Sequence, residues 1–261
     1  MPAEHYGPWA VIAGGSEGVG ASYARRLAAE GIHLVLIARK PQPLADLAAE
    51  IRAAHRVEVR TLAQDLTAPD MIDTVRALTD DIEVGFLLYN AGAVSHFGDF
   101  LDDDRAVAAR MIRLGVDAPT RLCHHFAGPM RWRGRGGIVL VGSLAGYAGA
   151  PGEIVYAAAK AFARTFAEGL WHELKPHGVD VQGLILGLTR TPSAGRLGLA
   201  MDNPDFVPDE PDAIAAGSFA HLGEGPLWHP GDKEAAARYL GSLPRAEAVG
   251  FMAAGAKALH G

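Results

Sequence analysis

The sequence predicts an α/β fold in which one doubly wound parallel sheet carries helices on both faces. Short apolar runs alternate with amphipathic, helix-like stretches along most of the chain. The first apolar run leads directly into a glycine-rich turn and then into a helical pattern. Strands that alternate with helices require right-handed crossovers, which place the strands parallel and the helices over both faces. With no internal repeat or linker, we expect a single domain over residues 1–261.

Four strands are predicted in the first third of the chain, because buried parallel strands have sequences that are short, continuous apolar runs. Trp9–Ala13 is the first of them, and Pro41 and Pro43 precede the helix that follows the second. The predicted strands cover 9–13, 32–38, 57–63 and 84–89, and the helices between them cover 21–30, 44–55 and 69–79.

The rest of the chain continues the alternation. Acidic residues at 102–104 indicate the start of a long helix reaching about 125, because the helix dipole favours acids there. A strand over 137–142 leads to Ser143, and a helix from about 155 ends before Pro176. A strand over 179–186, a helix over 211–222, a turn over 223–231 and two short helices separated by Pro244 follow. We expect 190–225 to act as a substrate lid and 226–261 as a C-terminal extension.

Composition narrows the range of partners and compartments. The 261 residues are 49% hydrophobic, which is ample for one large core. The net charge of −6 gives no basic footprint for nucleic acid. One cysteine, Cys123, excludes an intramolecular disulfide and fits a reducing compartment. Without a signal-peptide or membrane-span pattern, the sequence predicts a cytoplasmic protein that binds neither nucleic acid nor membrane.

A tyrosine and a lysine four residues apart form the chain's most informative chemical pattern. Tyr156 and Lys160 would share one face of a helix, where the ammonium should lower the pKa of the phenol. Ser143, at the end of an apolar strand, can hold a carbonyl oxygen while the tyrosine gives or takes its proton. The same spacing also occurs on exposed helix surfaces, so a second signal is needed.

The glycine-rich turn after the first strand supplies that signal. Gly14 permits a tight turn, while Gly18 and Gly20 let the backbone approach a pyrophosphate and let the helix pack on the sheet. The helix N-terminus adds N–H groups and a positive dipole. The other residues of this nucleotide-phosphate loop are Ser16, Glu17 and Val19. Three residues separate the first two glycines, unlike the usual G-x-G-x-x-G spacing.

With both motifs in order, the chain resembles the short-chain dehydrogenase/reductase family, whose domain is a Rossmann-type fold. Further family motifs occur at Asp65-Leu66, at Tyr89-Asn90-Ala91-Gly92 and at 186–191, where a leucine replaces the usual proline. The resemblance implies catalysis by Ser143, Tyr156 and Lys160 and no metal. The cofactor-binding residues that it adds to the glycine loop are Asp65, Leu66, Asn90, Ala91, Gly92, Tyr156, Lys160, Gly187, Thr189 and Thr191.

The end of the second strand should select the nicotinamide cofactor. Enzymes that use NAD usually hold an acid there, which binds the ribose 2′-OH and repels a 2′-phosphate. Here Arg39-Lys40 follow the strand, and no acid occurs before Asp46. Because Arg39 can pair with a 2′-phosphate, we expect NADP(H), with NAD(H) as the alternative. Glu17 argues the other way, since NADP-preferring relatives often hold a base at that place.

The expected substrate is an uncharged, bulky ketone or secondary alcohol, because the segments beside the site are small or apolar. The predicted wall residues are Tyr147, Leu197, Leu199, Met201 and Phe206. The stretches 6–9, 17–20 and 186–193 resemble bacterial 7β-hydroxysteroid dehydrogenases and their relatives. We therefore expect an oxidoreductase, and the alternative is a non-catalytic nucleotide-binding or regulatory protein.

Two further expectations concern helices. Gly115 stands where the family carries an asparagine whose main-chain carbonyl holds a water linked to the lysine; glycine keeps that carbonyl, so Gly115→Asn should leave activity similar or slightly raised. Family members usually pair through the helices before and after the fifth strand, which predicts a homodimer or homotetramer. The apolar residues available for that interface are Leu114, Leu122, Phe126, Phe162, Phe166 and Leu170.

Overall fold

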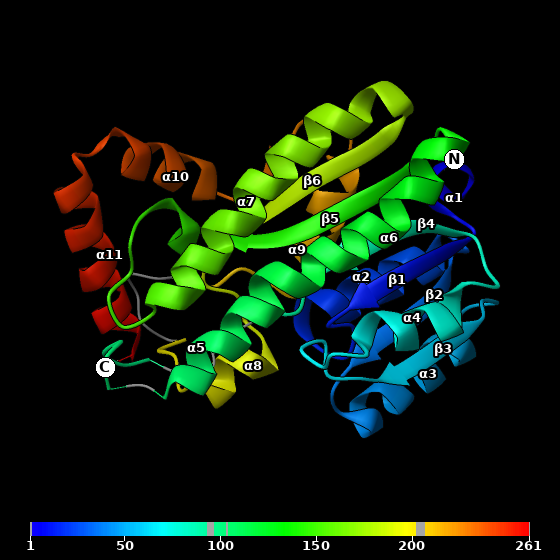
Figure 1. Cartoon of the computed structure of the whole chain (residues 1–261), viewed down its shortest axis with the longest axis horizontal. Helices are drawn as coiled ribbons and strands as arrows, with labels where there is room; N and C mark the ends of the chain where they lie inside the picture. Colours follow the sequence, from blue (N-terminus) through cyan, green and yellow to red (C-terminus); the bar gives the residue numbers. More distant parts are fainter. Residues whose placement is uncertain (1, 93–96, 103, 202–206, 261) are drawn as a thin grey trace.

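The computed structural model describes residues 2–92, 97–102, 104–201 and 207–260 (Figure 1). Seven parallel strands form one sheet in the order β3-β2-β1-β4-β5-β6-β7. The strands are β1 (Trp9–Ala13), β2 (His33–Ala38), β3 (Val59–Ala63), β4 (Val84–Tyr89), β5 (Gly136–Ser143), β6 (Val179–Leu186) and β7 (Leu227–Trp228). The predicted fold class is therefore confirmed. The chain order reverses between β1 and β4, which makes their carboxyl ends the switch point where ligands bind in such sheets.

Helices cover both faces of the sheet, as the alternation of strands and helices requires. Successive residues of β1 point to opposite faces, so Ala10 and Ile12 join one core cluster while Val11 and Ala13 join the other. The first cluster is covered by α2 (Gly18–Ala29), α3 (Pro41–Ala54) and α9 (Pro211–Ala220). The second is covered by α4 (Met71–Thr79), α6 (Ala118–Arg133) and α7 (Ile154–Leu174).

Several elements were not expected from the sequence. They are α1 (Pro2–Tyr6), α8 (Pro192–Arg196), the two-residue strand β7 inside the predicted turn, and the 3-10 turns Leu144–Tyr147 and Lys175–His177. The long helix predicted from residue 102 begins only at Arg105, where the Asp104 carboxylate accepts a 2.8 Å hydrogen bond from the Ala106 N–H. It is then divided into α5 (Arg105–Ile112), a π-helical turn over Arg113–Asp117, and α6.

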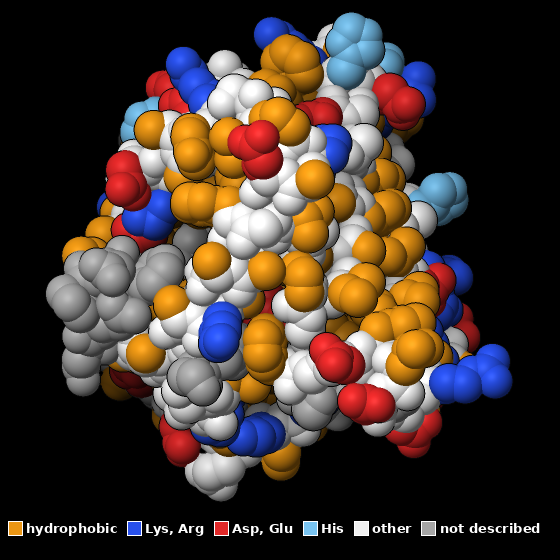
Figure 2. Space-filling model, turned by 90° about the vertical axis from the view of Figure 1, so that its left-hand side faces the viewer, with side chains coloured by type: hydrophobic (Ala, Val, Ile, Leu, Met, Phe, Trp, Pro, Cys, Tyr) orange, Lys and Arg blue, Asp and Glu red, His pale blue; other side chains and the backbone are white. Residues whose placement is uncertain are grey.

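The C-terminal helices α10 (Lys233–Ser242) and α11 (Arg245–His260) stand together beside the start of α7, at the left of Figure 1. The rings of Tyr239 and Phe251 join them, with centroids 5.6 Å apart. Figure 2 looks onto this end of the molecule and shows many apolar side chains there. No helix in the described part of the chain is long and apolar enough to span a membrane.

Only some of the side chains expected at a subunit interface are available for one. Leu122 and Phe126 lie in the protein's own core. Phe162, Phe166 and Leu170 on α7 are partly exposed, with the two phenylalanine rings stacked at 5.1 Å. The homo-oligomer stays a prediction that rests mainly on this face of α7.

The π-helical turn places the chain unusually close to α7 at Gly115. A Cβ on Gly115 would lie 2.6 Å from the Cβ of Ala159, well inside van der Waals contact. The Tyr89 hydroxyl donates to the carbonyl of Leu114 in the same turn. Glycine is therefore needed for space at the crossing of two elements, which revises the expectation that asparagine would be tolerated there.

We predict that Gly115→Ala lowers the free energy of unfolding by about 1–3 kcal/mol, because the added methyl overpacks the contact with Ala159. Gly115→Asn should cost more. Urea unfolding measures both changes, and adding Ala159→Gly should recover part of the loss. A Gly115→Ala variant as stable as the parent would contradict this explanation of the glycine.

Candidate active site

One cavity of about 760 Å³ opens at the carboxyl ends of the strands, where the strand order reverses. Every sequence-predicted catalytic and cofactor-binding residue lines it except Gly20. The sequence-predicted residues on its wall are Gly14, Ser16, Glu17, Gly18, Val19, Arg39, Lys40, Asp65, Leu66, Asn90, Ala91, Gly92, Ser143, Tyr156, Lys160, Gly187, Thr189 and Thr191. Residues from seven separate segments thus meet at one opening.

Close backbone packing shapes the glycine loop. Gly14 and Gly18 have φ values of +84° and +55°, which favour glycine. The Asn90 amide Nδ2 donates to the Gly14 carbonyl at 2.9 Å and ties the loop to the end of β4. A Cβ on Gly20 would lie 2.1 Å from that same carbonyl oxygen. Gly20 therefore packs α2 against the loop, as predicted, and is not among the residues that line the cavity.

The loop fits a dinucleotide pyrophosphate. Its glycines leave no side chain over the turn, and α2 begins at Gly18, so the first N–H groups of the helix lie at the loop. Gly92, across the cavity, has a φ of +123° and approaches no side chain closer than the Lys160 Nζ, at 3.9 Å from a Cβ built there. Backbone is thus accessible to a ligand on both sides of the switch point.

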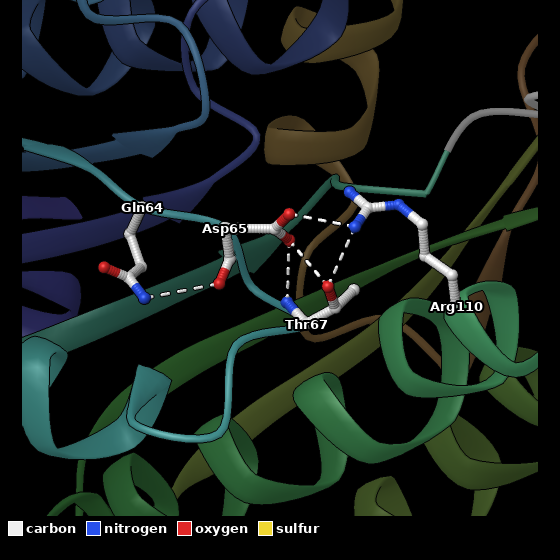
Figure 3. Close-up of polar contacts among 4 residues, drawn as sticks. All are labelled: Gln64, Asp65, Thr67 and Arg110. Carbon is white, nitrogen blue, oxygen red and sulfur yellow. Dashed lines mark hydrogen bonds and ion pairs between the residues drawn. The ribbon is translucent and has the colours of Figure 1, made fainter. Parts of the chain in front are cut away.

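The far end of the cavity is organised by Asp65, which follows β3 (Figure 3). Its Oδ1 accepts hydrogen bonds from the Thr67 backbone N–H at 2.9 Å and from the Thr67 hydroxyl at 2.8 Å. Its Oδ2 accepts from Arg110 of α5 at 2.9 Å. Burial alone would raise the pKa of Asp65, but the bonds from Thr67 and Arg110 outweigh it and lower that pKa to about 2. Asp65 is therefore a fixed, ionised acceptor.

Arg110 is a cavity residue that sequence reasoning missed. It lies more than forty residues from Asp65 in the chain, and no local motif surrounds it. Arg39 and Lys40, at the end of β2, line the same end of the cavity as expected. The cavity wall therefore includes three cationic side chains, of which Arg110 pairs with Asp65.

Ser143, Tyr156 and Lys160 meet in the middle of the cavity. Ser143 ends β5, and its hydroxyl accepts a hydrogen bond from the Ala145 N–H at 3.2 Å. Tyr156 and Lys160 are one turn apart on α7, and the Lys160 Nζ lies 5.5 Å from the centre of the Tyr156 ring. The ammonium donates to the Val141 carbonyl at 2.9 Å. The β5 strand thus positions both the serine and the lysine head group.

The pKa values of this pair differ from the sequence expectation. Burial raises the pKa of Tyr156 to about 12; the hydrogen-bonding contact with Ser143 acts in the lowering direction, and the charge of Glu153 acts in the raising direction. Burial thus outweighs the lowering that was predicted from Lys160, whose Nζ is hydrogen-bonded to the Val141 carbonyl and not to the phenol. Burial also lowers the pKa of Lys160 to about 8, since the charged form is poorly solvated there.

One part of the cavity wall is built largely from the C-terminal helices. The residues that α10 and α11 contribute are Ala236, Leu240, Phe251, Met252, Gly255, Ala256 and Leu259. Sequence reasoning treated this stretch only as an extension. Its small and apolar residues repeat at helical spacing, but the pattern does not show which surface they cover.

Only some of the predicted wall and lid residues line the cavity. Leu197 and Leu199 line the cavity, while Tyr147 instead hydrogen-bonds His229 at 2.9 Å and Met201 lies off the wall. Phe206 lies outside the described residues. Helix α9, also assigned to the lid, packs on α2 in the core through Ile214, Ala215 and Phe219.

The pattern of the short chain dehydrogenase family matches residues 8–201. The chain belongs to this family. It is accordingly an oxidoreductase acting on CH–OH groups. Within the described residues, no group of three or more His, Cys, Asp or Glu side chains is placed to hold a metal ion.

Individual relatives refine the comparison. A 7β-hydroxysteroid dehydrogenase of Clostridium sardiniense is 32% identical over 216 residues, which are 83% of this chain and 79% of that protein. A solved 7β-hydroxysteroid dehydrogenase structure superposes with a TM-score of 0.87 at 28% identity, covering 96% of this chain and 98% of the other. A short-chain dehydrogenase from Sphingobium yanoikuyae in complex with NADPH gives 0.79 at 33% identity, covering 92% and 97%.

Proposed function

We propose that the protein is an NADP(H)-dependent oxidoreductase that interconverts a bulky, apolar ketone and its secondary alcohol. The observation that supports this proposal most directly is that Ser143, Tyr156 and Lys160 line the same cavity as an apolar wall from α10 and α11. Its other end holds the glycine loop and Arg39. The relationship to a 7β-hydroxysteroid dehydrogenase supports a steroid-like size for the substrate.

The three central side chains divide the work at the substrate oxygen. With a pKa of about 12, Tyr156 is protonated at neutral pH and can give its proton to the oxygen as the ketone is reduced. Ser143 contacts Tyr156 and offers a second hydroxyl to the same oxygen, which fixes its position. The nicotinamide, when bound, exchanges a hydride with the substrate carbon. Lys160 brings positive charge beside the phenol, which stabilises the phenolate left after proton transfer.

The shape and polarity of the wall set the substrate class. Leu144, Leu240 and Met252 are among the apolar side chains facing the cavity, and burial of apolar surface is what holds an uncharged polycyclic or branched molecule. Glu153, which also lines the cavity, gives a polar contact for a distal hydroxyl of such a substrate. A strongly anionic substrate would meet this carboxylate near Tyr156.

Tyr156→Phe should reduce turnover about 100- to 10,000-fold, because the proton donor is removed, while cofactor affinity stays within a few-fold. Steady-state assays of cofactor consumption over a panel of bulky ketones measure the change. Tyr147→Phe is the matched control, since Tyr147 lies off the cavity wall and bonds His229. Wild-type turnover in Tyr156→Phe on a true substrate would sink the assignment.

Arg39→Ala should weaken NADPH binding by about tenfold, from the loss of a charge-assisted contact with the 2′-phosphate, and should barely change NADH binding. Calorimetry with both cofactors makes the comparison, with the exposed Arg56→Ala as a control outside the cavity. Equal losses for the two cofactors would point to stacking on adenine alone. Tighter native binding of NADH would reverse the choice of cofactor.

NADPH affinity should fall as pH rises through about 8. Below that pH Lys160 carries its charge in the cofactor-free protein; above it the side chain must take up a proton when it meets an anionic cofactor. The 2′-phosphate does not titrate in this range. Titrations at pH 7 and 9.5 test the effect, and Lys160→Met should bind more weakly at both with no such trend. Constant wild-type affinity would contradict a lysine pKa near 8.

A further inference from the structure

The phosphate loop contains an acid where an anion is expected to bind. Glu17 immediately precedes the first residue of α2 and lines the cavity beside Ser16 and Gly18. The helix dipole favours a carboxylate at this position. A pyrophosphate at the same helix end would nevertheless be repelled by it, because like charges at such distances interact strongly in a partly desolvated cleft.

A residue from the opposite wall pairs with this acid. Arg196, at the end of α8, donates through Nη1 to the Glu17 Oε2 at 3.0 Å and through Nη2 to Oε1. The two residues are 179 positions apart in the chain, and both line the cavity. Their side chains are 49% and 32% exposed, so the pair contributes little to folding stability. The main consequence of the ion pair is instead for the charge that a ligand meets when it enters the cleft.

The position of α8 is set by contacts with the same loop. Thr191 begins the helix by accepting a hydrogen bond from the Ala194 N–H at 3.1 Å. The Thr191 Cγ2 lies 2.8 Å from where a Cβ on Gly18 would stand, so only glycine allows this approach. The segment that carries Arg196 thus rests on two successive residues of the phosphate loop, Glu17 and Gly18.

We propose that Arg196 is a cofactor-specificity residue that cancels the charge of Glu17 and so allows the loop to accept the more anionic dinucleotide. The proposal rests on the proposed NADP(H)-dependent function. Asp65 is neutralised in the same way by Arg110. Within the described residues Arg39 and Lys40 have no ion-pair partner, so the cleft keeps positive charge for phosphate.

With Arg196 on the loop, the carboxylate of Glu17 is neutralised. Without Arg196, the charge of Glu17 would repel the phosphates of a bound dinucleotide. Because a 2′-phosphate adds about −1.5 to −2 charge at neutral pH, the effect is larger for NADPH than for NADH.

Calorimetric titration with NADPH and with NADH tests the proposal on wild type, Arg196→Met, Glu17→Gln and the double variant. Arg196→Met should weaken NADPH binding about tenfold and NADH binding about threefold or less. The double variant should return both affinities to near wild type, because no uncompensated carboxylate remains. Thermal melting of each variant checks that it folds.

The matched control is Arg190→Met, which breaks the neighbouring Arg190–Glu210 pair on the same segment but outside the cavity, and should leave both affinities unchanged. Equal losses for both cofactors in Arg196→Met, or a double variant as weak as Arg196→Met, would overturn the proposal. If the NADP(H) assignment fails, wild type will instead bind NADH more tightly than NADPH. The ratio of the losses in NADPH and NADH affinity caused by Arg196→Met would still test the role of Arg196.

Discussion

The close approach of the carboxyl ends of β1 and β4 is the constraint on which the site depends. The N–H groups of Asn90 and Ala91 both donate to the Ala13 carbonyl, at 2.8 and 3.0 Å, and the Asn90 side chain reaches Gly14. A side chain on Gly14 would meet the Ala91 backbone at 2.7 Å. This packing brings the backbone of the glycine loop and of the residues after β4 together at the point where the strand order reverses. The residues that line the cavity are arranged around that point.

Charged side chains in the cleft form ion pairs with residues from distant parts of the chain. Asp65 and Glu17 are carboxylates on the cofactor side, and each is held by an arginine from an element far along the chain. Lys160 has a different environment. It is buried, burial lowers its pKa, and its Nζ donates a hydrogen bond to the Val141 carbonyl of β5. The ammonium is therefore costly to maintain in the buried site, which is why the proposed cofactor binding should be linked to its protonation.

Most of the architecture and the central chemistry could be predicted from sequence, because they depend on local patterns. The continuous apolar runs predicted six of the seven strands. The glycine turn and the Tyr156–Lys160 spacing predicted residues that line one cavity in the structure. The π-helical turn at Gly115 and the two-residue β7 could not be predicted. Each depends on what a distant backbone or side chain leaves room for.

Sequence alone determined the fold class and the family and pointed to the candidate catalytic side chains, since these follow from periodicity and from short-range spacing. Tertiary structure alone decided which elements line the cavity: α11 supplies part of its wall, while α9, which had looked like a lid, belongs to the core. It also decided that Lys160 bonds a strand carbonyl and that Arg196 pairs with Glu17. Such facts arise from contacts between segments far apart in the chain, and no local pattern of residues records them.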